Sequence, residues 1–231
     1  MKHSIEYGPA FAWLRVQLDP GEEIEAEAGA MVTRSPQLEM STRLNAGKRA
    51  GFFQKFIAFF VALVRKFAGG ETMFVNDFSG PSGGEVVIAP SLSGHIEHRP
   101  LADGQGLLVQ SGSYLASSEK VGTKLKWAGL RGLFGGEGLF FIHCTGPGDL
   151  FINSYGGVTP IEVDGAYVVD TGHIVAFDEG LDFEIKSAGK GLKALFLSGE
   201  GLVCRFTGRG TVYVQSRNVG GLVGWISPYL R

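Results

Sequence analysis

Residues 135–154, GGEGLFFIHCTGPGDLFINS, hold a Gly-Glu signature followed by a glycine-containing turn and a strand-like run. The signature occurs three times, as GGETMF from Gly69, GGEGLF from Gly135 and SGEGLV from Ser198. The turn and strand after it read GPSGGEVVIAP from Gly80, GPGDLFINS from Gly146 and GRGTVYVQS from Gly208. Two signals at a nearly constant offset indicate an internal repeat.

The stretch before each signature is also repeated. It reads EAEAGAMV around Gly29, LVQSGSYL around Gly112 and VVDTGHIV around Gly172, and alternating strand-like residues precede each one. Alternation at period two is typical of half-buried strands. Each unit is therefore predicted to read strand, turn, strand, glycine corner, connection, strand, turn, strand.

These patterns predict an all-β fold that forms one compact domain over residues 1–231. The predicted pseudo-repeats cover residues 5–90, 91–154 and 155–217, with a C-terminal tail at 218–231. A hydrophobic content of 44% indicates a packed core, and 36 glycines indicate many tight turns.

The signature residues have a structural interpretation. Glycine at a turn permits positive φ or close backbone approach, and a carboxylate beside it can accept backbone N–H bonds. We therefore assign a structural turn role, and no catalytic role, to Gly70, Glu71, Gly136, Glu137, Gly199 and Glu200.

The net charge of −2 conceals a strong segregation of charge. Residues 43–70 hold six basic residues and no acid, and residues 120–136 hold four basic residues and no acid. Two cationic surfaces on an acidic body are the expected result.

The first basic stretch contains the only segment whose pattern predicts a helix, an insertion at about residues 45–68. Its phenylalanines gather on one face of a helical wheel and its basic residues on the other. The apolar run from Phe56 to Val64 is too short to cross a bilayer. The segment suits three environments: the chain's own core, an oligomer contact, or an anionic membrane surface.

The second basic stretch occupies the equivalent place in the second unit and mixes lysines with Trp127, Leu130 and Phe134. Trp127 fits a core position equally well. The predicted membrane or partner surface therefore consists of Lys48, Arg49, Phe52, Phe53, Lys55, Phe56, Phe59, Phe60, Leu63, Arg65, Lys66, Phe67, Lys124, Lys126, Trp127 and Arg131.

No residue pattern indicates catalysis, a metal site or a cofactor. His95 and His98 lie three apart, so on a strand they point to opposite faces. The glycine-rich runs lack the Lys-Ser/Thr ending of a phosphate-binding loop. Cys144 and Cys204 are expected as small buried residues of a cytoplasmic protein, since no stretch resembles a signal peptide.

Six motifs in order, EAGAMV, GSYLAS, GGEGLFF, SYGG, VDTGHIVAF and SGEGLVCRFTG with VYVQSR, resemble the altered-inheritance-of-mitochondria family over about residues 5–217. The resemblance implies a fold like the tryptophan RNA-binding attenuation protein. Three short double-stranded β-helix-like sandwiches would form one chain, and chains would form a ring-shaped homotrimer. Mitochondrial relatives are linked to inner-membrane organisation, and the family supplies no catalytic residues.

We do not expect RNA binding, although the attenuation protein binds RNA, because the basic residues cluster in two stretches instead of repeating beside aromatic residues. We expect a non-enzymatic, homo-oligomeric scaffold that is cytoplasmic and contacts a membrane surface or a partner protein through the basic stretches. The alternatives are a small-molecule sensor with a cavity in a β unit and, third, a cupin-like enzyme.

Overall fold

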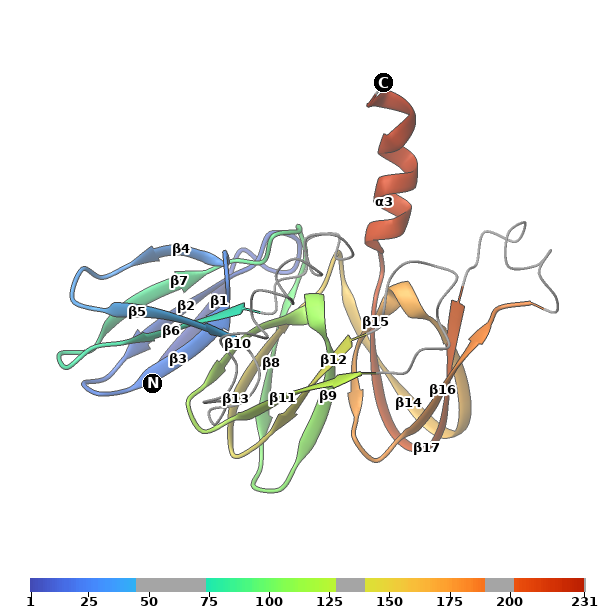
Figure 1. Ribbon diagram of the computed structural model, residues 1–231, viewed down its shortest axis with the longest axis horizontal. Helices are drawn as coiled ribbons and strands as arrows, with labels where there is room; N and C mark the ends of the chain where they lie inside the picture. Colours follow the sequence, from blue (N-terminus) through green and yellow to red (C-terminus); the bar gives the residue numbers. More distant parts are fainter. Residues whose placement is uncertain (45–73, 128–139, 190–201, 231) are drawn as a thin grey trace, which may run out of the picture.

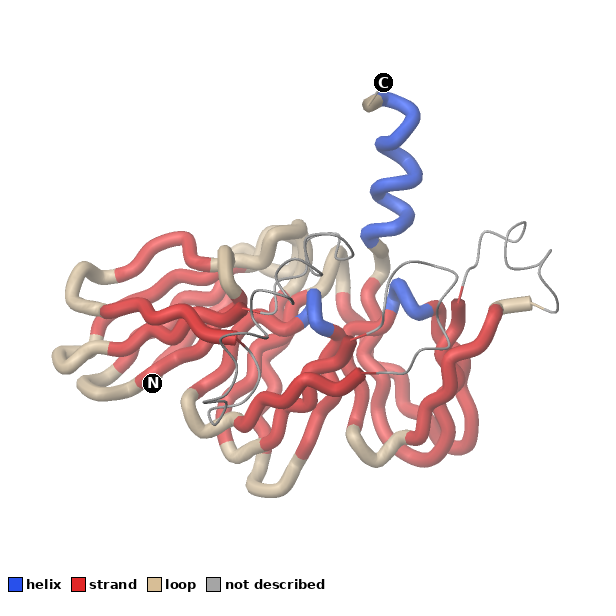
Figure 2. Tube along the Cα trace, in the orientation of Figure 1, coloured by secondary structure: helices blue, strands red, loops and turns tan. Residues whose placement is uncertain are grey.

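The computed structural model describes residues 1–44, 74–127, 140–189 and 202–230. Antiparallel strands dominate it, with one α-helix and three single-turn helices among the described residues (Figures 1 and 2). The predicted all-β class is confirmed. The predicted insertion at 45–68 lies outside the described residues, and the sandwich form and the likeness to the attenuation protein stay predictions.

The described part of the first unit contains seven strands. Their bounds are β1 Lys2–Glu6, β2 Trp13–Leu18, β3 Glu23–Glu27, β4 Met31–Arg34, β5 Glu39–Leu44, β6 Phe74–Ser79 and β7 Gly84–Ile88. Strand β7 pairs with β2 and β4, and strand β6 pairs with β3 and β5. Strand β1 adds to the outer side of β2.

The second unit repeats this pairing scheme without a counterpart of β1. Its elements are β8 Ile96–Leu101, β9 Gly106–Gln110, η1 Ser111–Ser113, β10 Tyr114–Ser118, β11 Gly122–Trp127, β12 Phe140–Thr145 and β13 Gly148–Asn153. Strand β13 pairs with β8 and β10, and strand β12 pairs with β9 and β11.

The third unit keeps the scheme but fuses strands. Its elements are β14 Val158–Asp170, η3 Thr171–His173, β15 Ile174–Asp178, β16 Asp182–Ser187 and β17 Leu202–Gln215. Strand β17 pairs with β14 along its whole length, with β15 on its second half and with β16 on its first half. Gly165 faces Gly208 in this long pair, with φ values of 106° and 113°. Only glycine adopts such φ values readily, so these two residues replace the turns of the other units.

Neighbouring units are joined by equivalent strand pairs. Strand β3 pairs with β10 at the first junction, and strand β9 pairs with β15 at the second. The cores cross these junctions, since Leu115 and Phe151 pack with first-unit residues, and Leu108 and Phe141 pack with third-unit residues. The three units follow one another along the long axis of the molecule (Figure 1).

The described α-helix does not lie where the sequence analysis placed the only helix. Helix α3, Val219–Ile226, follows β17 and continues into η4, Ser227–Tyr229. The sequence analysis found a helix pattern only at about residues 45–68, so it missed α3 in the C-terminal tail at 218–231. Three glycines obscure the helical pattern, because each costs about 1 kcal/mol in a helix. The sequence nevertheless held a start signal, Asn218, whose side chain caps the helix by accepting a hydrogen bond from the Gly221 N–H at 2.6 Å.

Candidate functional site

Two strand edges at opposite ends of the unit series lack the partner that their counterparts have. Among the described strands, β4 pairs only with β7, and residues 166–170 of β14 pair only with β17. The counterparts of β4 are β10 and β15, which pair with β3 and β9 of the preceding unit. The counterparts of residues 166–170 are β3 and β9. We call these two places the β4 edge and the β14 edge.

Side chains at the two edges are more exposed than their counterparts at the internal junctions. Val32 on β4 is 46% exposed, whereas its counterparts Leu115 and Val175 are fully buried. Val168 on the β14 edge is 54% exposed, whereas its counterpart Leu108 is 5% exposed. Met31 and Tyr167 are also exposed. Apolar residues that are buried in one unit are therefore in solvent where the series ends.

The internal junctions also predict a register for the two edges. Ala116 faces Ala26 at the first junction, and Ala176 faces Val109 at the second. Both β10 and β15 carry a bulge just before this alanine, and β4 carries one between Met31 and Thr33. The equivalent pairs between two chains are Thr33 with Val169, Arg34 with Val168, and Ser35 with Tyr167.

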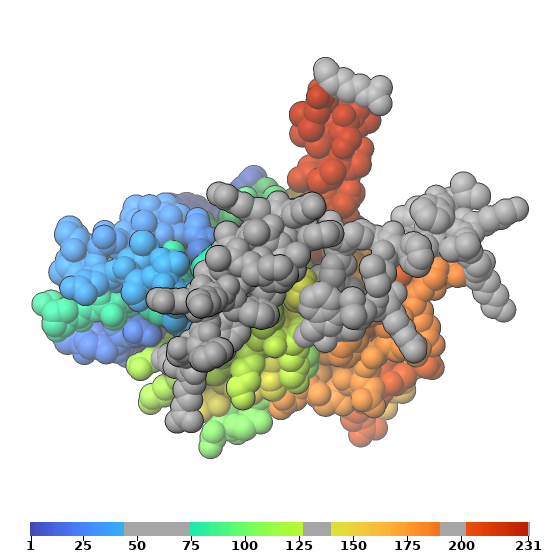
Figure 3. All heavy atoms as spheres, in the orientation of Figure 1, coloured from blue at the N-terminus to red at the C-terminus, as the bar shows by residue number. Residues whose placement is uncertain are grey.

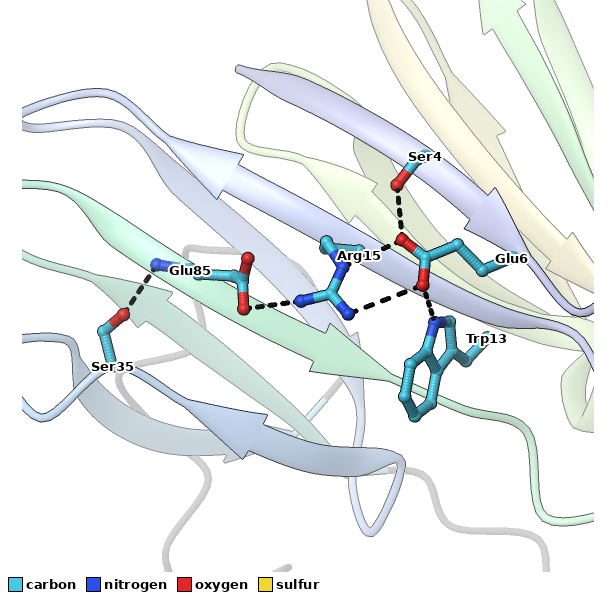
Figure 4. A network of polar contacts seen from close by, with 6 residues as sticks. All are labelled: Ser4, Glu6, Trp13, Arg15, Ser35 and Glu85. Atoms are coloured by element: carbon cyan, nitrogen blue, oxygen red, sulfur yellow. Dashed lines mark hydrogen bonds and ion pairs between the residues drawn. The ribbon is translucent and has the colours of Figure 1, made fainter.

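A polar network stiffens the sheet that carries the β4 edge (Figure 4). Arg15 on β2 donates to Glu6 on β1 at 2.9 Å and to Glu85 on β7 at 2.7 Å, and the Trp13 indole N–H donates to Glu6 at 2.7 Å. The Glu85 N–H donates to the Ser35 hydroxyl at 2.9 Å. The network thus links β1, β2 and β7 to the residue that follows β4.

Hydrogen bonds from Arg15 first, then from Trp13 and Ser4, lower the pKa of Glu6 to about 2 from its ordinary 4.5. Since the unfolded chain takes up the proton at higher pH, Glu6 stabilises the fold fully above about pH 4.5, and the stabilisation is lost as the pH falls toward 2. We expect Glu6→Gln to flatten the decline in stability over this range.

Urea unfolding of wild type and Glu6→Gln at several pH values checks this expectation. Asp164→Asn is the control, because the ion pair of Asp164 with Arg209 is exposed and weak. Parallel pH profiles for wild type and Glu6→Gln would contradict it.

A second polar network lies inside the first junction. Arg43 on β5 donates to Asp77 on β6 at 2.7 Å and to Glu25 on β3. The other Glu25 oxygen accepts from the Tyr114 hydroxyl at 2.6 Å. Burial first, and then the charge of Glu25, raise the pKa of Tyr114 well above its usual value. Glu25, Asp77 and Tyr114 are buried, and the hydrogen bond from Tyr114 to Glu25 joins the second unit to the first.

The histidines and cysteines have structural partners. His98 Nε2 contacts Asp149 Oδ1 at 2.7 Å, and the ring centroids of His98 and His3 lie 4.3 Å apart. Burial is the main cause that lowers the pKa of His3. Burial raises the pKa of Cys204 to about 12 and raises that of Cys144 further, so neither is a reactive thiolate at neutral pH. Within the described ranges, no three His, Cys, Asp or Glu side chains converge to hold a metal ion.

The structure places few of the residues predicted as a membrane or partner surface. Lys124 and Lys126 are exposed on β11, which lies at the edge of its sheet. Trp127 ends β11 with its backbone opposite Phe140, and nothing is described of its side chain. The other residues of this surface lie outside the described residues, and so do the six signature residues Gly70, Glu71, Gly136, Glu137, Gly199 and Glu200. Where the structure describes the chain, it contains no helix long and apolar enough to cross a membrane.

The sequence analysis missed the two edges, although the signal was present. Aligning the three units around Gly29, Gly112 and Gly172 puts apolar residues of β4 and β14 at the positions that join units. A linear series of three units has two junctions and therefore two unused ends. The repeat alone could have located them.

Comparison with known proteins supports the family resemblance. The family model "Mitochondrial biogenesis AIM24" matches residues 3–217. An uncharacterized protein of Streptococcus pyogenes serotype M6 is 30% identical over the whole chain and 91% of its own length. A crystal structure of a Streptococcus pyogenes protein is similar with a TM-score of 0.81, at 27% identity and 99% coverage of both chains. As the six motifs predict, this chain belongs to the AIM24 family.

Proposed function

We propose that this protein is a non-enzymatic scaffold that assembles from identical copies, joined head to tail through the β4 edge of one copy and the β14 edge of the next. The observation that carries the proposal is the exposure of Val32 and Val168, whose counterparts are buried at both internal junctions. The third unit of one chain would be followed by the first unit of another, as the first is followed by the second.

Energetics favour this contact. An unpaired edge strand presents free backbone N–H and C=O groups, and proteins usually cover such edges or guard them with charge. The β4 edge offers Met31 and Val32, and the β14 edge offers Tyr167 and Val168, all exposed. Pairing the edges would satisfy the backbone groups and bury these side chains, at about 25 cal/mol per Å² of apolar area.

Head-to-tail contacts are heterologous, so they close into a ring when the rotation between copies allows it. The homotrimer implied by the family resemblance is one such ring. A closed ring leaves neither edge exposed, which limits further association. Its surface would repeat the same faces around an axis, which suits a scaffold that holds several partners.

Disulfide cross-linking tests the proposed register. Thr33→Cys combined with Val169→Cys in one chain should give covalent oligomers under mild oxidation, because facing residues of antiparallel strands have Cα atoms about 4.5–5.5 Å apart. Native Cys144 and Cys204 are fully buried and do not compete. Met40→Cys with Val169→Cys is the control, because Met40 is exposed like Val32 but lies on β5.

Light scattering coupled to size separation gives the oligomeric state of the wild type. A monomer at micromolar concentration, or equal cross-linking by the control pair, would contradict the proposal. Stoichiometric metal in the purified protein would contradict its non-enzymatic part.

No observation on the described residues favours the alternative functions. A depression of about 300 Å³ beside Glu23, Glu39 and Glu119 is open and acidic, unlike the enclosed apolar pocket of most small-molecule sites. A membrane contact of the basic stretches stays a prediction. The exposed lysines Lys124 and Lys126 also fit another role, because charged side chains on an edge strand such as β11 oppose pairing with a further strand.

A further inference from the structure

Helix α3 stands clear of the β body (Figures 1 and 3). Residues 219–230 carry no charge, and Trp225 is 67% exposed, with Val223, Tyr229 and Leu230 similarly exposed. The Trp225 and Tyr229 rings lie 5.9 Å apart on one side of the helix. A helix that is apolar on nearly all sides is normally covered by protein or lipid.

The base of this helix is held at the β14 edge. Asn218 contacts His173 Nε2 at 2.7 Å, and His173 Nδ1 contacts the Gln215 carbonyl oxygen at 2.7 Å. His173 belongs to η3, which directly follows residues 166–170. A Cβ on Gly172 would lie 3.3 Å from Asn218 Cβ, so the tail and the edge are in close contact. The position from which α3 starts is therefore tied to the proposed interface.

The other two units show where a chain goes from this position. After β7, residues 91–95 cross to the second unit, and after β13, residues 155–157 cross to the third. The crossing segments contact each other through a Gly94–Gly156 bridge, and the Ser216 N–H donates to the Gly157 carbonyl at 2.9 Å. The chain after β17 occupies the place that these two crossing segments occupy in the other units. By analogy, it would lead to the first unit of a second copy.

An exposed aromatic loop lies at the corresponding place in the first unit. The Ala12 N–H donates to the Gly94 carbonyl at 3.1 Å, so the residues before β2 belong to the same end of the molecule. The loop between β1 and β2 exposes Phe11 to 73% and Tyr7 to nearly the same extent. Tyr7 packs on Trp13 with ring centroids 5.0 Å apart, which holds the loop in place.

We propose that α3 docks on the neighbouring copy, with Trp225 and Tyr229 packed against the Tyr7–Phe11 loop of that copy. This inference rests on the proposed head-to-tail assembly and adds a second, side-chain contact to the strand pairing. A second copy is the occupant because α3 begins where both internal crossing segments enter the next unit. A membrane would cover the helix equally well, but it would not explain this placement.

Light scattering at a series of protein concentrations measures how tightly each variant associates, and this tests the contact. Trp225→Ser with Tyr229→Ser should weaken association at least tenfold, since buried aromatic residues dominate interface energies. Phe11→Ser should weaken it by a similar factor, and all three changes together should cost little more than either set, because the two sets remove one shared contact. Met40→Ser is the control for an exposed apolar residue elsewhere.

Fluorescence gives an independent measure. The emission of Trp225, obtained as the difference between wild type and Trp225→Phe, should shift to the blue when the protein assembles in the absence of lipid. Vesicles of phosphatidylserine and phosphatidylcholine provide the competing environment. A blue shift that requires vesicles, with association unchanged in the serine variants, would overturn the docking and favour a membrane.

Failure of this inference is distinguishable from failure of the proposed function. If Val32→Lys dissociates the protein while the Trp225 and Tyr229 variants assemble as tightly as wild type, only the docking of α3 is wrong. If Val32→Lys leaves association unchanged, the head-to-tail interface is wrong, and the docking falls with it.

Discussion

Replacing Val32 with lysine is expected to turn the assembly into folded monomers. Val32 is 46% exposed in the single chain, so the monomer tolerates lysine at little cost. In the proposed interface this position corresponds to Leu115 and Val175, which have no exposed surface. Burying an unpaired ammonium there costs several kcal/mol, which weakens association at least 100-fold.

Met40→Lys is a closely matched control, because Met40 is also 46% exposed and also lies on an edge strand, β5. The counterparts of β5, which are β11 and β16, pair only with strands of their own unit, although Phe183 on β16 also packs on Phe141 of the second unit. The Met40 variant should therefore weaken association much less than the Val32 variant. Sedimentation across a concentration range measures both, and circular dichroism verifies folding. Equal association of the two variants would refute the β4 edge as an interface.

Replacing Arg43 with methionine is expected to destabilise the chain by about 3 kcal/mol, the lower end of the range for breaking a buried ion pair. The side chains of Glu25 and Asp77 are only 6% and 10% exposed, whereas that of Arg43 is 24% exposed. Burial alone would lower the pKa of Arg43, but Asp77 and Glu25 raise it above its usual value. Without the guanidinium, two buried carboxylates share one site, and no other described residue provides a cation to them.

Arg209→Met provides the matched control. Arg209 and Asp164 form an ion pair with side chains 83% and 78% exposed, so its loss should cost under about 1 kcal/mol. Urea unfolding compares the two variants. Adding Glu25→Gln and Asp77→Asn to Arg43→Met should recover part of the loss, since the buried charges are removed together. Equal effects of Arg43→Met and Arg209→Met would show that the junction network contributes little.

The sequence predicted the strands better than it predicted the surfaces. Alternating residues such as those of β2 are a local signal, and they identify a strand because one of its faces is buried. The tail was misread because Gly220, Gly221 and Gly224 lower helix propensity, while the cap at Asn218 acts through a single hydrogen bond. The candidate surface of basic residues is described only at Lys124, Lys126 and the backbone of Trp127.

Local pattern in the sequence was sufficient for the all-β class and the family, because alternation and turn glycines act over a few residues. It did not predict the two strands that each unit forms between the glycine corner and the signature, such as β4 and β5, where only a connection was expected. Strand pairing decided the rest. Val32 and Leu115 occupy equivalent places in similar stretches, and only the presence or absence of a preceding unit makes one exposed and the other buried. That difference is a long-range property of the sheet, since a strand edge is free or paired according to what the whole chain places beside it.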